Sequence, residues 1–110
     1  MLYYVLVSDQ GLEVRFSKNQ VLPDIRELLG LDIEVKDKAF LEITEHQFVD
    51  KSLVILSKDA ADGEVNFVTK KGRELRGLLL ILGMDTNEKF FLISATQVKS
   101  VIPQLLRRYD

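Results

Sequence analysis

The stretch "GLLLILGMDTNEKFFLIS", residues 77–94, decides the fold class of this chain. Its apolar run "LLLIL" stands between two glycines and is typical of a strand that is buried on both faces. The polar run "MDTNEK" (84–89) has the composition of a turn, and the aromatic run 90–94 then returns as an antiparallel strand. The stretch therefore predicts a hairpin at the centre of an antiparallel sheet.

The residues that follow predict a helix over about 95–108. Ser94 and Gln97 have the spacing of a capping box, and apolar residues continue at helical spacing behind them. We expect Pro103 to kink this helix or to restart it, with Ser100 as a second cap.

The beginning of the chain predicts a second hairpin. Residues 1–8 are β-branched and aromatic, and Leu12, Val14 and Phe16 alternate with charged residues. The turn-forming residues 8–11 separate the two runs. We expect two antiparallel strands, of which the second has one face in water.

A second helix is predicted over about 20–29, because apolar residues recur there at helical spacing. Asn19 is its candidate cap, Pro23 falls in its first turn, and Gly30 ends it.

The middle of the chain holds further strand candidates, and the whole order is strands, helix, strands, helix. The candidates are residues 31–37, 39–43, 52–57 and 65–68, and the segment 58–64 between the last two is expected to be a loop. The order predicts one α+β domain over residues 1–110. It has a mostly antiparallel sheet of five to seven strands, with both helices packed on one face.

Composition excludes several classes of protein. The chain has 110 residues, which suits one domain, and it contains no cysteine, so disulfides, thiolate metal sites and cysteine nucleophiles are excluded. Its start lacks the basic region of a signal peptide, and no apolar run approaches the roughly 20 residues that span a bilayer. We therefore expect a cytoplasmic protein without membrane contact. The formal net charge of -2 gives no global attraction to nucleic acid.

Two stretches carry a resemblance to a known family: "LPDIRELLGLDIEV" (22–35) and "GLLLILGMDTNEKFFLISATQV" (77–98). Together with the leading strand they cover about half of the chain and resemble a small family of phage- and plasmid-borne bacterial domains of unknown function. Residues 36–76 lie outside the resemblance. It implies a mobile-element accessory protein in a bacterial host, and it supplies no catalytic residue.

Motifs for catalysis and for metal or cofactor binding give no site. His46 is the only histidine, belongs to no ligand or triad motif, and is expected in a surface turn. The acidic run 59–64 lacks the ligand spacing of a calcium loop, and no glycine lies in a phosphate-binding motif. We predict no catalytic residue, no metal and no cofactor. A weaker alternative is an enzyme with an unrecognised pair of carboxylates, for which Glu42 and Glu45 are one candidate pair and Asp32 and Glu34 another.

One basic cluster is the candidate macromolecule-binding site. Lys70, Lys71, Arg73 and Arg76 put four cations into seven residues, and Arg107 and Arg108 join them if the last helix ends nearby. Solvated charges at the end of a hairpin, contact with nucleic acid, and contact with an acidic protein all remain open. The first half of the chain is instead acidic, and its carboxylates are expected on the wet sides of strands: Asp32, Glu34, Asp37, Glu42, Glu45 and Asp50. Such a face serves solubility or docks on a nucleic-acid-binding protein.

The leading hypothesis is a non-enzymatic accessory protein that binds a host protein and inhibits a host nucleic-acid enzyme or defence complex. The alternative is a nucleic-acid-binding module that uses the segment 70–76. A homodimer paired through an edge strand of the first hairpin is also open.

Overall fold

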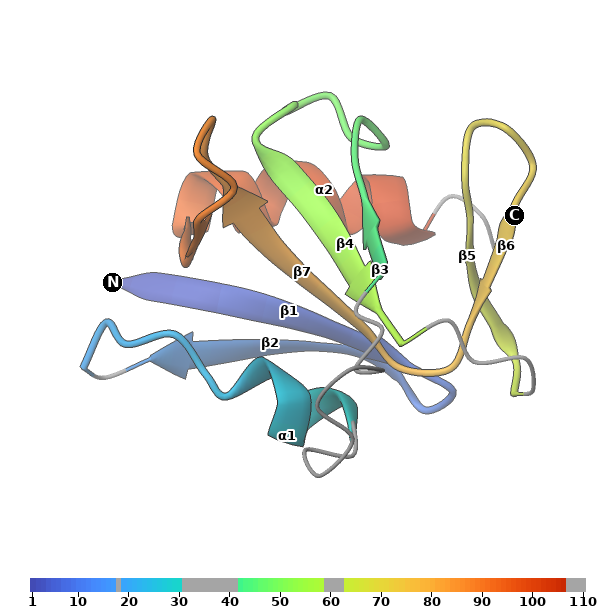
Figure 1. Cartoon of the computed structure of the whole chain (residues 1–110), viewed down its shortest axis with the longest axis horizontal. Coiled ribbons are helices and arrows are strands. Elements are labelled where there is room, and N and C mark those ends of the chain that lie inside the picture. The colour runs from blue at the N-terminus through green and yellow to red at the C-terminus, as the bar shows by residue number, and fades with distance from the viewer. Residues whose placement is uncertain (18, 31–41, 59–62, 107–110) are drawn as a thin grey trace.

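The computed structural model describes residues 1–17, 19–30, 42–58 and 63–106 (Figure 1). The strand predicted over 31–37, most of the one over 39–43, and part of the loop over 58–64 lie outside these residues. So does the predicted end of the last helix at 107–108.

The described residues form an antiparallel sheet of seven strands, which confirms the α+β class. Its main path has the order β2-β1-β7-β4-β3, and β8 and β9 pair with β7 and β1 beside that path. The strands are β1 (Leu2–Ser8), β2 (Gly11–Ser17), β3 (Glu42–Thr44), β4 (Leu53–Ser57), β7 (Leu79–Met84), β8 (Phe90–Phe91) and β9 (Ile93–Ser94). The predicted first hairpin is confirmed as β1 and β2, and the apolar run at 78–82 is confirmed as the central strand β7.

The return strand predicted over 90–94 is wrong in one respect, because it is split at Leu92. β8 pairs with β7, whereas β9 pairs with the first residues of β1. β7 covers only Val5–Val7 of β1 and leaves the start of β1 without a partner on that side. After β8 the chain passes to β1, and β9 pairs with Leu2 and Tyr3 on that side.

A second sheet consists of two strands, β5 (Val65–Val68) and β6 (Glu74–Arg76). β5 was predicted, but β6 was not, because Leu75 is a single apolar residue among charged ones and gives no periodic signal. Leu75 pairs with Phe67 and is buried. The ring of Phe67 packs 5.9 Å from that of Phe48, which attaches this hairpin to the core.

The two helices, α1 (Ile25–Leu29) and α2 (Ala95–Leu106), cover opposite faces of the sheet, so the prediction of both on one face is wrong. Every residue of β4 is buried, and such a strand has two apolar faces that each need a cover. Figure 1 shows α2 behind β4 and β7. The α2-side layer includes Val5, Ile55, Ile81, Val98, Val101 and Leu105. The α1-side layer includes Leu6, Leu29, Val54, Leu80, Leu82 and Leu92.

α1 begins later than predicted, at residue 25 rather than 20. Its N-cap is Asp24, whose carboxylate accepts hydrogen bonds from the backbone N–H groups of Arg26 and Glu27 at 3.1 and 3.2 Å. Gln20 has a φ of 53°, outside the helical range. Pro23 therefore precedes the helix. The predicted stop at Gly30 is confirmed by its left-handed φ of 68°.

The capping box of α2 is confirmed by two reciprocal hydrogen bonds. The Gln97 backbone N–H donates to Ser94 Oγ at 3.2 Å, and the Ser94 backbone N–H donates to Gln97 Oε1 at 2.9 Å. The helix runs through Ser100 and Pro103 without a restart, so the second cap is wrong. Gln104 Nε2 instead donates to the Ser100 carbonyl at 2.9 Å. Neither helix in the described ranges has the length or apolar character to cross a membrane.

Candidate functional site

A groove of about 510 Å³ lies between β3 and the β5–β6 hairpin, and we call it the β3–hairpin groove. One wall is β3 with the turn behind it, residues 42–47. The other wall is the hairpin tip, formed by residues 69–71 and Arg73. Segments more than twenty residues apart in sequence thus share one surface.

Three hydrogen bonds hold the hairpin tip in shape. The Thr69 N–H donates to the Arg73 carbonyl at 2.8 Å, and the Gly72 N–H donates to the Thr69 carbonyl at 2.9 Å. The Arg73 N–H donates to Thr69 Oγ1 at 3.0 Å. Thr69 is buried, whereas Lys70 and Lys71 between these anchors are exposed. The tip therefore presents the two lysines on a fixed turn.

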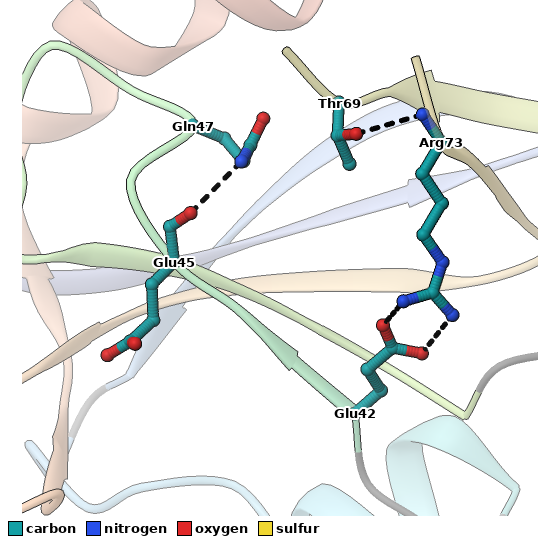
Figure 2. Close-up of polar contacts among 5 residues, drawn as sticks. All are labelled: Glu42, Glu45, Gln47, Thr69 and Arg73. Atoms are coloured by element: carbon teal, nitrogen blue, oxygen red, sulfur yellow. Dashed lines mark hydrogen bonds and ion pairs between the residues drawn. The ribbon is translucent and has the colours of Figure 1, made fainter. Parts of the chain in front are cut away.

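Polar bonds join the two walls. The Lys70 backbone N–H donates to Gln47 Oε1 at 2.7 Å, and Gln47 Nε2 donates to the Glu45 carbonyl at 3.0 Å. The Arg73 guanidinium donates through both terminal nitrogens to the Glu42 carboxylate, with Nη2 at 2.6 Å from Oε2 (Figure 2). A planar, two-pronged pair of this kind fixes the relative position of its partners.

The structure divides the predicted basic cluster. Lys70 and Lys71 line the groove, and no ion pair of the described residues engages them. Arg73 also lines it but is paired with Glu42. Arg76 lies outside the groove lining, with its guanidinium on Glu74 at 3.1 Å and on the Gly63 carbonyl at 3.0 Å. Arg107 and Arg108 fall outside the described residues.

The acidic residues are divided as well. Glu42 and Glu45 line the same groove as the lysines, so this surface carries both signs of charge. Asp50 lies elsewhere, and hydrogen bonds from Ser52 and Gln97 lower the pKa of its carboxyl. Asp32, Glu34 and Asp37 lie outside the described residues.

His46 occupies an exposed turn, as predicted, with a φ of 63°. It lines the groove together with Glu42 and Glu45, which is the composition that the enzyme alternative requires. Acid–base catalysis uses groups in a sheltered cleft with separated pKa values. Glu45 and His46 are exposed, and the Glu42 carboxylate is paired with Arg73. In the described residues no three His, Cys, Asp or Glu side chains gather into a metal-binding group.

Sequence reasoning missed Ile43, Gln47 and Thr69 as parts of this site. Thr69 had a local signal, because a threonine before "KKG" favours a turn closed by its own hydroxyl. Gln47 had none, since its partner Lys70 is 23 residues away.

A second hollow, also of about 510 Å³, lies beside the start of β4 and is lined in part by Lys51, Met84, Asp85 and Phe91. It shares Glu45 with the β3–hairpin groove, but in the described ranges it contains none of the predicted basic residues. The β3–hairpin groove is therefore the candidate site.

Comparison of the chain with models of protein families, with curated proteins and with solved structures found no match. The resemblance to phage- and plasmid-borne domains stays a prediction. Function is accordingly inferred from the geometry of the groove.

Proposed function

We propose that this chain is a non-enzymatic protein-binding module and that the β3–hairpin groove receives an extended segment of a partner protein. The observation that carries the proposal is the mixed charge of the groove, which has Lys70 and Lys71 on one wall and Glu42 and Glu45 on the other. Charges of both signs in a groove select a partner by charge pattern.

The outer edge of β3, with which no strand of the described residues pairs, supports an extended partner segment. The Met84 N–H donates to the Ser52 carbonyl at 2.8 Å, so the backbone groups of Met84 face β4. The N–H and C=O of successive residues in a strand point alternately to its two sides. Followed through the registers of β7 with β4 and of β4 with β3, this alternation places the N–H and C=O of Ile43 on the outer edge of β3. The side chain of Ile43 is 40% exposed. An extended peptide can pair with such an edge and place an apolar side chain on Ile43.

The charges favour protein over nucleic acid. A phosphate backbone is bound by several unpaired cations, and its affinity grows with their number. Arg73 and Arg76 already have carboxylate partners, and Glu45, which also lines the groove, repels phosphate. Both walls match a protein segment that places acidic side chains on Lys70 and Lys71 and a basic or polar side chain on Glu45.

The kind of partner follows from the resemblance at residues 22–35 and 77–98. A mobile-element accessory protein acts on its bacterial host, so we propose a host protein in the cytoplasm as the partner. A host enzyme of nucleic-acid metabolism or a defence complex would be inhibited by occupation of its own contact surface.

A photo-cross-linking amino acid at Ile43 tests the proposal in bacterial lysate, with the same group at Val49 as control. Val49 is 83% exposed and lies outside the groove lining. We expect a cross-linked protein at position 43 only, unchanged by nuclease treatment. The K70E/K71E variant should lose it, while K89E/K99E, with the same charge change at exposed lysines elsewhere, should keep it.

The nucleic-acid alternative has its own signature. Retardation of DNA or RNA that falls steeply with salt and is abolished by K70E/K71E but not by K89E/K99E would replace the protein partner by nucleic acid. Cross-linking of equal strength at positions 43 and 49 would contradict a role of the groove.

A further inference from the structure

The strand β2 forms the end of the sheet opposite to β3. Its seven residues pair with β1 on one side, and no strand of the described residues pairs with its other side. Proteins usually protect such an edge with proline, a bulge, a very short strand or charged side chains. β2 has seven residues, no proline and a regular register with β1, and its two charged side chains, Glu13 and Arg15, have opposite sign.

The hydrogen-bonding direction along β2 can be assigned. The Met84 N–H donates to the Ser52 carbonyl, so the backbone groups of Met84 point to β4 and those of its neighbours in β7 point alternately to β1 and β4. The registers of β7 with β1 and of β1 with β2 then give the side to which each residue of β2 points its N–H and C=O. The backbone groups of Leu12, Val14 and Phe16 therefore point outward from the sheet, which leaves three donors and three acceptors in one row.

The side chains of the same three residues form an apolar stripe. They stand opposite Val7, Val5 and Tyr3, and so belong to the α2 face of the sheet. Val14 is 38% and Phe16 45% exposed, and the Phe16 ring lies 5.9 Å from that of Tyr3. The stripe thus extends the α2-side layer to the edge of the sheet. A further strand paired with β2 would place its own side chains against the stripe.

The other face of β2 carries one acid and one base. Glu13 and Arg15 form an exposed ion pair, with Nε at 2.9 Å from Oε1. The residues before and after Val14 thus have opposite charges. A second β2 that runs antiparallel to the first and is centred on Val14 therefore sets each charge opposite one of the other sign.

We propose that β2 of a second copy of this chain pairs antiparallel with this β2, about a two-fold axis through Val14. In that register Leu12 stands opposite the partner's Phe16, and Glu13 stands opposite the partner's Arg15. All outward backbone groups of the three apolar residues find partners, and the apolar stripe becomes continuous across both copies.

The charges select this register among its neighbours. Outward-facing groups must meet outward-facing groups, so the nearest alternatives put the axis at Glu13 or at Arg15. The first places Glu13 opposite Glu13 of the partner subunit, and the second places Arg15 opposite Arg15 of the partner subunit. Like charges directly opposite each other destabilise a strand pair, and opposite charges stabilise it. Because β2 and β3 lie at opposite ends of the sheet, the dimer leaves both β3–hairpin grooves open.

Charge-reversal variants test the pairing by sedimentation equilibrium. We expect the wild type to dimerise with concentration, and E13R alone and R15E alone to remain monomeric, because each opposes like charges. An equimolar mixture of E13R and R15E should recover the dimer, since it sets two arginines of one chain against two glutamates of the other. The double variant E13R/R15E should dimerise by itself.

A proline variant separates pairing from folding. The N–H of Val14 points outward, so V14P removes no hydrogen bond to β1, and we expect a monomer with an unchanged circular dichroism spectrum. A wild type that stays monomeric at about 1 mM, the weak end of the affinity scale, overturns the proposal. So do single variants that still dimerise, or a mixture of monomeric variants that fails to associate.

Discussion

Asp50 is the residue through which the turn after β3 is fixed to the start of α2. Its Oδ1 accepts from the backbone N–H and the hydroxyl of Ser52 at 2.9 and 2.6 Å, and its Oδ2 accepts from Gln97 Nε2 at 3.1 Å. Gln97 is itself the partner of Ser94 in the capping box of α2. One carboxylate thus orients a side chain that closes the helix end.

These bonds predict a pH-dependent stability. The hydrogen bonds from Ser52 and Gln97 lower the pKa of Asp50 in the folded state. Stabilisation by this group is therefore complete above the carboxyl pKa of the unfolded chain and is lost as pH falls through the lowered value. We expect D50N to cost about 1 kcal/mol at pH 7 and progressively less toward pH 3. Urea unfolding across this range measures the difference, and a cost that is constant with pH would contradict the role of charge.

Gly83 predicts a packing effect at a single residue. A Cβ at this position would overlap the ring of Phe91, its cross-strand partner in β8. We expect G83A to destabilise the protein by about 1–3 kcal/mol, as overpacking does. In an F91A background the same substitution should cost much less. A double-mutant cycle by urea unfolding measures this coupling. If the destabilisations of G83A and F91A add up in the double variant, the cost of G83A does not arise from contact with the Phe91 ring.

The cap of α2 gives a prediction for a whole element. Ser94 ends β9 and begins α2, so it joins the return strand to the helix that covers one face. We expect S94A to lower the free energy of unfolding by about 1 kcal/mol, because the N–H of Gln97 loses its acceptor. T96A changes an exposed threonine in the same turn and should have little effect. Equal effects of both variants in urea unfolding would contradict the cap.

The elements differ in how far the sequence predicts them. β7, β4 and the capping box carry local signals, namely an apolar run and fixed spacing, and all three are confirmed. The predicted start of α1 was wrong because Val21 fits the helical spacing of apolar residues, although it is exposed and lies outside the helix. Periodicity records which residues are apolar, and it does not record which face of the sheet receives them.

The groove shows the same limit for the site. Its basic wall was predicted because Lys70, Lys71 and Arg73 are neighbours in sequence. Its other wall was not, since the pair of Arg73 with Glu42 spans 31 residues and the pair of Lys70 with Gln47 spans 23. Only the folded chain shows that the acidic and the basic residues share one surface.

At the scale of the whole molecule, the central strands serve both apolar layers at once. Along β7, Leu79 and Ile81 belong to the α2-side layer, and Leu80 and Leu82 belong to the α1-side layer. Neither layer can lose its packing without disturbing the strands that hold the other. The molecule should therefore unfold as one cooperative unit.

Neighbouring tyrosines of β1 allow this to be measured. Tyr3 packs against the α2-side layer and Tyr4 against the α1-side layer, so each reports on one face of the sheet. With Tyr109 replaced by phenylalanine in both, Y4F/Y109F keeps only the first reporter and Y3F/Y109F only the second. We expect the tyrosine fluorescence of each variant to change at the urea midpoint that its own far-ultraviolet circular dichroism gives. A fluorescence midpoint that precedes the backbone transition in one variant would mean that its layer opens first, and the two faces would then be separate units of stability.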